Sequence, residues 1–300
     1  MGEGFKIQGR VINKIQGFYY IETENNEIVE AKLRGILKKN NNKFNCVVGD
    51  LVELSEGNTI EELFPRKNIL TRPVVANVDY IAIQFAAKNP VLDYERINLL
   101  LLNAFFQKVI PAIIINKIDL LNADDLSCIK NKLSFLNKIN VPLFLISTKE
   151  KRGIKELEDF IKDKITVIGG PSGVGKSSLI NILQDEQVLK TGEISDRLKR
   201  GKHTTRDSNM MKLKVGGYII DTPGFSSIDI PNIKNLQELI SLFPEFRNIP
   251  PCKFLNCSHT HEPNCMVKNL LEKKEISIDR YNFYEKILNS LNERWNKYEK

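Results

Sequence analysis

The sequence predicts an α/β protein with a parallel sheet at its centre, a small β-barrel before the sheet and a mostly α-helical part after it. Three observations support this prediction. Apolar runs suited to buried strands alternate with helix-like segments in the middle of the chain, short β-like runs fill its first part, and a cysteine cluster followed by an amphipathic helix fills its last part. These changes of pattern divide the chain into residues 1–68, 69–227 and 228–300.

The first part alternates β-like runs, at residues 7–12, 18–21, 27–33 and 50–54, with turns rich in Gly and Asn. Many short strands without a helical period are typical of a small barrel. Its basic and aromatic residues together favour a stacking surface for RNA, although each one alone fits a solvated face or the barrel core better. They are Lys32, Arg34, Lys38, Lys39, Lys43, Arg66, Lys67, Phe18, Tyr19 and Tyr20.

After a linker at residues 66–73, the middle part is predicted to open with a strand at residues 77–83 and a core-facing helix over residues 93–109. The apolar run at residues 109–115 fits a strand covered on both faces, and it ends in Asn116-Lys117-Ile118-Asp119. Asp119 can accept hydrogen bonds from the N1–H and the amino group of guanine, which adenine cannot offer in that arrangement. We expect Asn116 to brace this loop and Lys117 to lie against the base.

A further apolar run, residues 141–146, ends in Ser147, Thr148 and Lys149. We expect the backbone N–H groups of this tripeptide to face the guanine oxygen. By itself the pattern fits an ordinary strand that ends in a polar turn, and the base loop one strand earlier favours the binding role.

A phosphate-binding loop follows in the chain. An apolar strand at residues 165–168 leads into a GxxxxGKS segment, which continues as a helix through residues 178–183. Glycines let the backbone wrap phosphates with its N–H groups, Lys176 is expected to reach the outer phosphates, and Ser177 to ligate magnesium. The predicted phosphate-binding residues are Gly170, Pro171, Ser172, Gly173, Val174, Gly175, Lys176, Ser177 and Ser178.

A basic segment at residues 197–206 is predicted to be an exposed switch. Either Thr204 or Thr205 would complete the magnesium shell, the alternative being a plain hydroxyl surface. Downstream, a strand at residues 218–220 ends in Asp221-Thr222-Pro223-Gly224. We expect Asp221 to hold magnesium and Gly224 to present its N–H to the γ-phosphate, although such a sequence is also a common turn.

The order of these motifs is unusual, because the base loop precedes the phosphate loop, whereas ordinary GTPases place it after. A parallel sheet assembles its ligand site at the carboxyl ends of its strands whatever the chain order, so this order is physically tolerable. It also means that the segment after Asp221 runs directly into the last part of the chain, to which it can transmit the nucleotide state.

Phe225 occupies the position where Ras-type enzymes have a water-orienting Gln, and it cannot form hydrogen bonds. We therefore hypothesise that His203 is the catalytic residue that positions the attacking water. The alternative is that His203 contacts only RNA or solvent.

The last part contains Cys252, Cys257 and Cys265 together with His259 and His261, and three thiolates with one imidazole suit a closed Cys3His zinc site. His261 is the alternative ligand to His259, and unpaired thiols are the alternative to a metal site. The two remaining cysteines, Cys46 and Cys128, are predicted to be core thiols. A helix is expected from Ser277 or Asp279, with its apolar stripe at Tyr281, Tyr284, Leu288, Leu291 and Trp295.

Composition bounds the partners. The 300 residues include 44 Lys and Arg against 37 Asp and Glu, a net charge of +7, which favours a polyanionic partner. No signal-peptide core and no run long enough for a membrane span are present, so we expect a cytoplasmic protein without a membrane partner.

The order NKID, STK, GGPSGVGKSS, GKHTT and DTPGF resembles that of the RsgA (YjeQ/YloQ) family of circularly permuted, small-ribosomal-subunit-dependent GTPases. The resemblance covers nearly the whole chain. It implies an OB-fold, a permuted GTPase domain with Mg²⁺ and GTP or GDP, and a C-terminal zinc domain in which His259 is the histidine ligand. It also implies binding to the small ribosomal subunit and its rRNA, with subunit-stimulated GTP hydrolysis late in assembly.

We expect a monomer. An alternative function is a nucleotide-gated rRNA-binding scaffold whose hydrolysis is incidental, and a GTPase acting on the large subunit is another. A P-loop kinase is disfavoured, because the NKID segment would then have no function.

Overall fold

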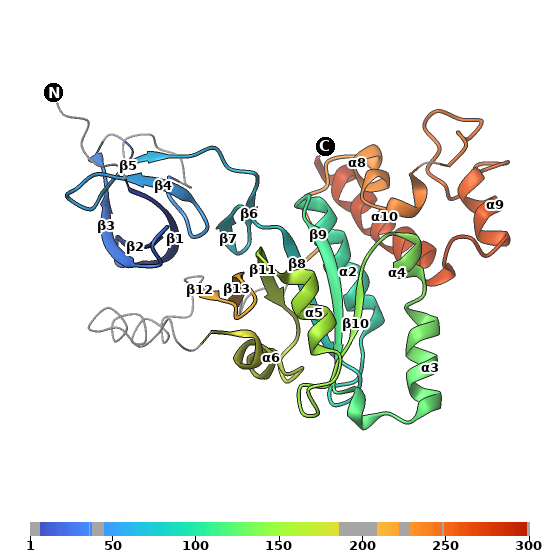
Figure 1. Cartoon of the computed structure of the whole chain (residues 1–300). Helices are drawn as coiled ribbons and strands as arrows, with labels where there is room; N and C mark the ends of the chain where they lie inside the picture. Colours follow the sequence, from blue (N-terminus) through green and yellow to red (C-terminus); the bar gives the residue numbers. More distant parts are fainter. Residues whose placement is uncertain are drawn as a thin grey trace.

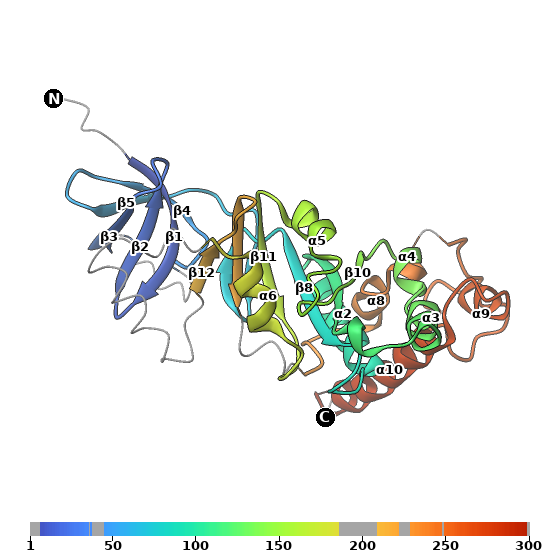
Figure 2. The same ribbon diagram turned by 60° about the horizontal axis from the view of Figure 1, so that its bottom comes forward.

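The computed structural model describes residues 7–35, 37, 45–185, 209–221, 229–247 and 249–298. It places a β-barrel at one end of the molecule, a mixed α/β region in the middle and a helical region at the other end (Figures 1 and 2). Within these described ranges, the helices are too short or too polar to cross a lipid bilayer.

The N-terminal barrel is closed and has the strand order β1-β2-β3-β5-β4. Its strands are β1 (Ile7–Ile15), β2 (Phe18–Thr23), β3 (Ile28–Leu33), β4 (Leu51–Leu54) and β5 (Thr59–Leu63). β3 and β5 run parallel, the other pairs are antiparallel, and β4 closes the barrel on β1. Val11, Ile21 and Leu54 are fully buried in its interior. The predicted OB-type barrel is confirmed.

Two aromatic residues of β2 correct the predicted stacking surface. Tyr19 and Tyr20 are only 5% and 3% exposed, so the expectation that both join Phe18 on an exposed face is wrong. Tyr19 points into the barrel core, whereas Tyr20 belongs to the apolar cluster that continues into the central sheet. The outer face of β2 is covered because the barrel packs against the rest of the protein. Phe18 is half-buried beneath Lys32, whose Nζ lies 5.1 Å from the ring centre.

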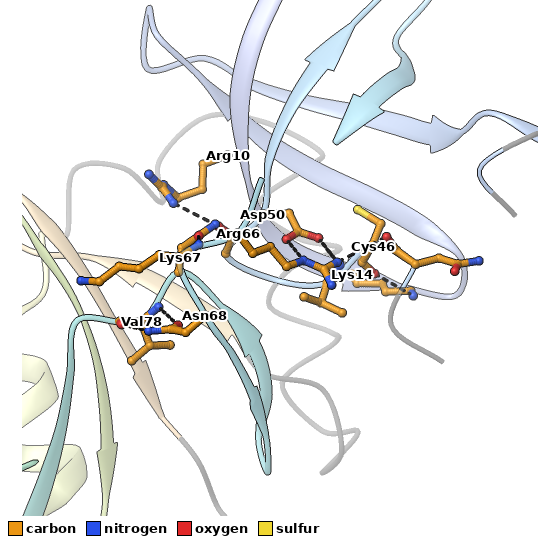
Figure 3. A network of polar contacts seen from close by, with 12 residues as sticks. Arg10, Lys14, Cys46, Asp50, Arg66, Lys67, Asn68 and Val78 are labelled. Atoms are coloured by element: carbon orange, nitrogen blue, oxygen red, sulfur yellow. Dashed lines mark hydrogen bonds and ion pairs between the residues drawn. The ribbon is translucent and has the colours of Figure 1, made fainter. Parts of the chain in front are cut away.

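A polar network joins the barrel to the chain that leaves it (Figure 3). The Arg66 guanidinium donates from Nε to Asp50 Oδ1 (2.6 Å) and from Nη2 to Asp50 Oδ2 (2.8 Å). The hydrogen bond to Asp50 raises the pKa of Arg66. Arg10 donates to Gly49 O, and Asn68 exchanges two hydrogen bonds with Val78. Residues 66–73, predicted as a linker, are thus held in place by hydrogen bonds. They include β6 (Ile69–Thr71), which pairs with β7 (Val74–Ala76).

The central sheet has six strands in the order β10-β9-β8-β11-β13-β12. β8 (Tyr80–Ala86), β9 (Ile110–Asn116), β10 (Leu143–Leu145), β11 (Lys164–Gly169) and β13 (Gly217–Asp221) are parallel, and β12 (Asn209–Lys212) is antiparallel to β13. The chain enters at the middle strand β8, fills one side out to β10 and returns to β11. The expected permuted parallel sheet is confirmed.

Helices cover both faces of this sheet. They are α2 (Tyr94–Phe106), α3 (Ala123–Lys132), α4 (Phe135–Lys138), α5 (Ile154–Ile161) and α6 (Lys176–Leu183), with the short η1 (Ile118–Leu120). On β8, Ile81 and Ile83 belong to the apolar cluster on one face of the sheet, and Ala82 belongs to the cluster on the other face. This alternation is the two-residue period of a strand. Cys46 is buried as predicted, but Cys128 is exposed on α3, so its assignment to the core is wrong.

The barrel docks on the edge of the sheet formed by β12 and β13. Glu22 is nearly buried, and its carboxylate accepts hydrogen bonds from Lys212 Nζ and from the Tyr218 hydroxyl, the latter at 2.6 Å. Asn13 Nδ2 donates to Asn209 Oδ1 at 3.3 Å. Burial, followed by the hydrogen bond to Glu22, raises the pKa of Tyr218. A polar, directional contact therefore fixes how the barrel sits on the sheet.

The C-terminal region contains α8 (Leu236–Ser241), η4 (Pro244–Phe246), α9 (Met266–Glu272) and α10 (Ile278–Tyr298). The predicted stripe of α10 forms its core contacts: Tyr281, Tyr284, Leu288 and Leu291 are buried and Trp295 is half-buried. Arg280 is 2% exposed and donates to Glu245 Oε1 (2.6 Å) and to Asn98 Oδ1 on α2 (3.2 Å). This buried guanidinium ties the helical region to the central α/β region.

Candidate nucleotide site and metal centre

The loop at residues 170–175 joins β11 to α6 and has the shape of an anion cradle. Gly170 and Gly175 have φ angles of 147° and 94°. A Cβ at Gly170 would lie 2.0 Å from Gln84 O, and one at Gly175 would lie 2.5 Å from Asn116 Nδ2, so both positions require glycine. Lys176 Nζ spans the loop, donating to Gly170 O and Pro171 O at 2.8 Å each.

The charge around this loop is set by Lys176 and Asp221. Burial lowers the pKa of Lys176, and attraction to Asp221 opposes that change. Asp221 ends β13, where it pairs in register with Ile168 of β11. Ser177 and Ser178 are exposed in the first turn of α6, next to Lys176. A cationic group, an acidic group and hydroxyls therefore meet at the carboxyl edge of the sheet.

The NKID segment at the end of β9 contacts the phosphate-type loop directly. Asn116 is fully buried, and its Nδ2 donates to Val174 O at 3.0 Å and to Thr148 Oγ1 at 3.3 Å. Its Oδ1 accepts from the N–H groups of Lys117 and Thr148. Lys117 Nζ reaches Gly173 O at 2.6 Å. The two loops, separated and reordered in the chain, thus form one surface.

Asp119 is held by Ser147, which was predicted to contribute to the site through its backbone N–H and not through its hydroxyl. The Ser147 hydroxyl donates to Asp119 Oδ1 at 2.6 Å, and this bond lowers the pKa of Asp119. The backbone N–H of Ser147 donates to Arg152 O, and that of Thr148 to Asn116 Oδ1. These two N–H groups are engaged inside the loop, a departure from the expectation that the tripeptide offers its N–H groups to a base. The sequence signal for the hydrogen bond from Ser147 to Asp119 is a serine shortly after β10, the strand that follows the NKID segment.

Other predicted site residues cannot be placed. His203, Thr204, Thr205 and Gly224 lie outside the described residues, and Asp221 is the last described residue before the 222–228 gap.

The four predicted metal ligands come together in the C-terminal region. One ligand atom from each of Cys252, Cys257, His259 and Cys265 lies within 4.8 Å of the others. Cys252 Sγ is 3.6 Å from His259 Nδ1 and 4.0 Å from Cys265 Sγ, and Cys265 Sγ is 3.5 Å from the same nitrogen. Tetrahedral zinc, with bonds of about 2.3 Å to sulfur and about 2.0 Å to nitrogen, places two sulfur atoms about 3.8 Å apart and a sulfur and a nitrogen atom about 3.5 Å apart. The cluster fits a structural zinc ion, whereas His261 is exposed.

The loop that carries these ligands is braced from two sides. Glu262 accepts hydrogen bonds from the N–H groups of Ser258 (2.6 Å) and Thr260 (3.2 Å). Burial would raise the pKa of Glu262, but the hydrogen bonds outweigh it and lower the pKa to about 2. From α10, the Tyr281 hydroxyl donates to His259 O and the Tyr284 hydroxyl to Ser258 O. These three supporting residues were not identified from the sequence, although Glu262 lies within the cysteine cluster.

Comparison with known proteins gives the family. Sequence profiles of the RsgA GTPase and of the RsgA N-terminal domain match residues 63–231 and 8–61. The chain belongs to the RsgA GTPase family. Its enzymatic activity is therefore GTP hydrolysis. The family and the circular permutation expected from the motif order are confirmed.

Full-length relatives support the same conclusion. A small ribosomal subunit biogenesis GTPase RsgA from Fusobacterium nucleatum subsp. nucleatum is 68% identical over 95% of this chain and 100% of its own length. The same-named protein of Clostridium acetobutylicum is 44% identical over 97% and 99%. Among solved structures, YjeQ from Thermotoga maritima superposes with a TM-score of 0.81 at 33% identity, covering 96% of this chain and 99% of that one. YloQ, a circularly permuted GTPase, gives 0.80 at 30% identity, with coverage of 97% and 96%.

Proposed function

We propose that this protein binds the small ribosomal subunit late in its assembly and hydrolyses GTP there, with turnover stimulated by the subunit. The observation that carries the proposal is the direct contact between the base loop and the phosphate loop, through Asn116 to Val174 and Lys117 to Gly173. Loops in contact can hold the base and the phosphates of one nucleotide. The subunit as partner is supported by the names of the relatives and by the net charge of +7.

This geometry supports the following nucleotide contacts as part of the proposal. Asp119, oriented by Ser147, reads the guanine edge, and the loop before α6 surrounds the phosphates with Lys176 as the cation. Ser177, in the first turn of α6, and Asp221, at the end of β13, offer oxygen atoms, and oxygen is the ligand type that magnesium prefers. Magnesium, when bound, supplies charge neutralisation at the phosphates. Thr204 or Thr205, and Gly224, stay predictions.

His203 remains our candidate for orienting the attacking water, because Phe225 cannot do so. We expect His203→Ala to lower subunit-stimulated turnover at least about tenfold while GTP affinity stays within about twofold of the unaltered protein. The measurement is phosphate release at saturating GTP together with equilibrium GTP binding. Unchanged turnover with normal binding would remove His203 from the mechanism.

The three-part division at residues 1–68, 69–227 and 228–300 also belongs to this proposal, as do a monomeric state and a cytoplasmic location. The barrel then presents its exposed basic residues to rRNA. The helical region, reached directly from the segment after Asp221, reports the nucleotide state to the ribosomal surface.

The decisive experiment is a GTPase assay with purified small subunits, purified large subunits or neither. We expect small subunits to raise turnover strongly and large subunits to have little effect. Tight, nucleotide-dependent binding of small subunits without stimulation would favour the alternative of a nucleotide-gated scaffold. Stimulation by large subunits alone would contradict the choice of partner.

A further inference from the structure

Gln84 is a fully buried polar residue on the middle strand β8, and its side chain reaches the phosphate loop. Its Nε2 donates to Val174 O at 3.1 Å. The same carbonyl accepts the 3.0 Å hydrogen bond from Asn116 Nδ2 on β9. Val174 is itself fully buried, so two amide donors from neighbouring strands fix one carbonyl at the floor of the loop.

The backbone of Gln84 lies against the start of the same loop. The Cβ that Gly170 lacks would fall 2.0 Å from Gln84 O, so backbone meets backbone at this point. One residue of β8 thus contacts the loop at its beginning, through the main chain, and near its end, through the side chain.

The other end of the Gln84 amide has no hydrogen-bond partner within the part of the chain that the structure describes. Because a carbonyl oxygen only accepts, the amide nitrogen must face Val174, and Gln84 Oε1 then points elsewhere. This oxygen is buried, and no donor among the described residues reaches it. A buried oxygen without a hydrogen bond destabilises the fold, and an apolar side chain of the same length would avoid that cost. Packing alone therefore does not explain a glutamine at this position.

The fixed carbonyl determines the direction of a neighbouring N–H group. The Val174–Gly175 peptide is trans, so its N–H points opposite to its C=O. With the carbonyl held by side chains of β8 and β9, the N–H of Gly175 is turned away from these two strands. Gly175 has no Cβ to restrict its backbone, so contacts rather than its own conformational preference set this orientation.

We propose that Gln84 is a positioning residue for nucleotide binding, which holds the Val174 carbonyl so that the Gly175 N–H is aimed at the phosphates before the nucleotide arrives. The proposal rests on the nucleotide site proposed above. Loop N–H groups of this kind surround the α- and β-phosphates, which GTP and GDP share. Loss of the Gln84 donor therefore lowers the affinity for GTP and the affinity for GDP by the same factor.

The test is Gln84→Met, which keeps the length of the side chain and removes both polar atoms. We expect the Kd for fluorescent GDP and for a non-hydrolysable GTP analogue to rise about three- to tenfold each. The nucleotide-free variant is expected to unfold at the same temperature as the unaltered protein or higher, because the unpartnered oxygen is gone. Gln84→Leu serves as a second variant with the same expectation.

Thr166→Val is the matched control. Thr166 on the adjacent strand β11 is 1% exposed and also has a buried oxygen without a partner among the described residues, and none of its hydrogen bonds reaches the loop. This variant is expected to bind both nucleotides as the unaltered protein does.

Unchanged Kd values in both Gln84 variants would overturn the proposal. So would affinity and unfolding temperature that fall together, or variants that do not fold, because Gln84 would then be a stabilising core residue only. Failure of the unaltered protein and of Thr166→Val to bind guanine nucleotides would instead refute the nucleotide site itself.

Discussion

At the scale of single residues, the base selectivity that we propose depends on one carboxylate, that of Asp119, held by one hydroxyl, that of Ser147. Ser147 is fully buried and its hydroxyl is directed at Asp119, which keeps the carboxylate in a single orientation. The hydrogen bond also lowers the pKa of Asp119, so the group is ionised at neutral pH. An ionised carboxylate accepts hydrogen bonds and cannot donate one, which matches the two donors on the guanine edge.

Asp119→Asn tests this matching. The Asn side chain offers one donor and one acceptor where the Asp carboxylate offers two acceptors. Its N–H donor repels one of the two guanine donors, but it can pair with xanthine, which has an oxygen in place of the amino group. We expect GTP affinity to fall about a hundredfold or more and affinity for xanthosine triphosphate to rise. Competition against a fluorescent nucleotide measures both. Retention of GTP affinity within about threefold would show that Asp119 does not read the base.

At the scale of elements, the conformation of the loop at residues 252–265 depends on contacts with α10 and on the four candidate metal ligands within the loop. Two tyrosine hydroxyls of α10 donate hydrogen bonds to carbonyl groups of this loop, and the Glu262 carboxylate accepts hydrogen bonds from N–H groups of the loop. The helix and the cysteine cluster therefore stabilise each other, and we expect the loop to lose its shape without metal.

Cys257→Ser removes one ligand and is expected to abolish stoichiometric zinc and to lower the free energy of unfolding by about 3 kcal/mol or more. Metal analysis of the purified protein and chemical denaturation provide the measurements. His261→Ala is the control, because His261 is exposed and outside the cluster. Equal zinc content in Cys257→Ser and the unaltered protein would contradict the Cys3His assignment.

Elements also show which parts of the fold the sequence could predict. β9 is apolar until Asn116, and β11 contains the apolar residues Ile165, Val167 and Ile168 directly before the glycine loop, so both strands could be predicted, as could the regular apolar stripe of α10. β5 (TIEEL) and β12 (NMMK) have little such pattern, and they are strands because neighbouring strands pair with them. Glycine and lysine spacing marked the phosphate loop, but Ser147, Gln84 and Glu262 act through contacts that exist only after folding. Tyr20 was misplaced for the same reason, since a second region covers its face.

At the scale of the whole molecule, the barrel and the sheet are joined through Glu22. The side chain of Glu22 is 4% exposed and that of Lys212 is 23% exposed, so this ion pair is largely shielded from water. Removal of one partner of a buried pair leaves an uncompensated charge, which destabilises a protein more than loss of an exposed pair does.

Glu22→Gln is therefore expected to destabilise the contact between barrel and sheet by about 2–4 kcal/mol. Hydrogen exchange should show faster exchange in β1, β12 and β13, with little change in β9. Lys67→Ala is the matched control, because its ion pair with Asp79 is exposed and contributes less than about 1 kcal/mol. Equal effects of the two substitutions would mean that Glu22 does not hold the barrel in place.

The position of the barrel has one more consequence, which concerns solubility. β12 is an outer strand of the sheet, and an outer strand offers unpaired backbone groups on which another chain can add a strand. β1 lies against β12, with Asn13 bonded to Asn209, so the barrel shields this margin. The opposite margin, β10, has only three residues and offers a short template. Among the described residues, the barrel supplies no residue to the nucleotide loops, yet it covers an edge of the sheet on which another chain could otherwise add a strand.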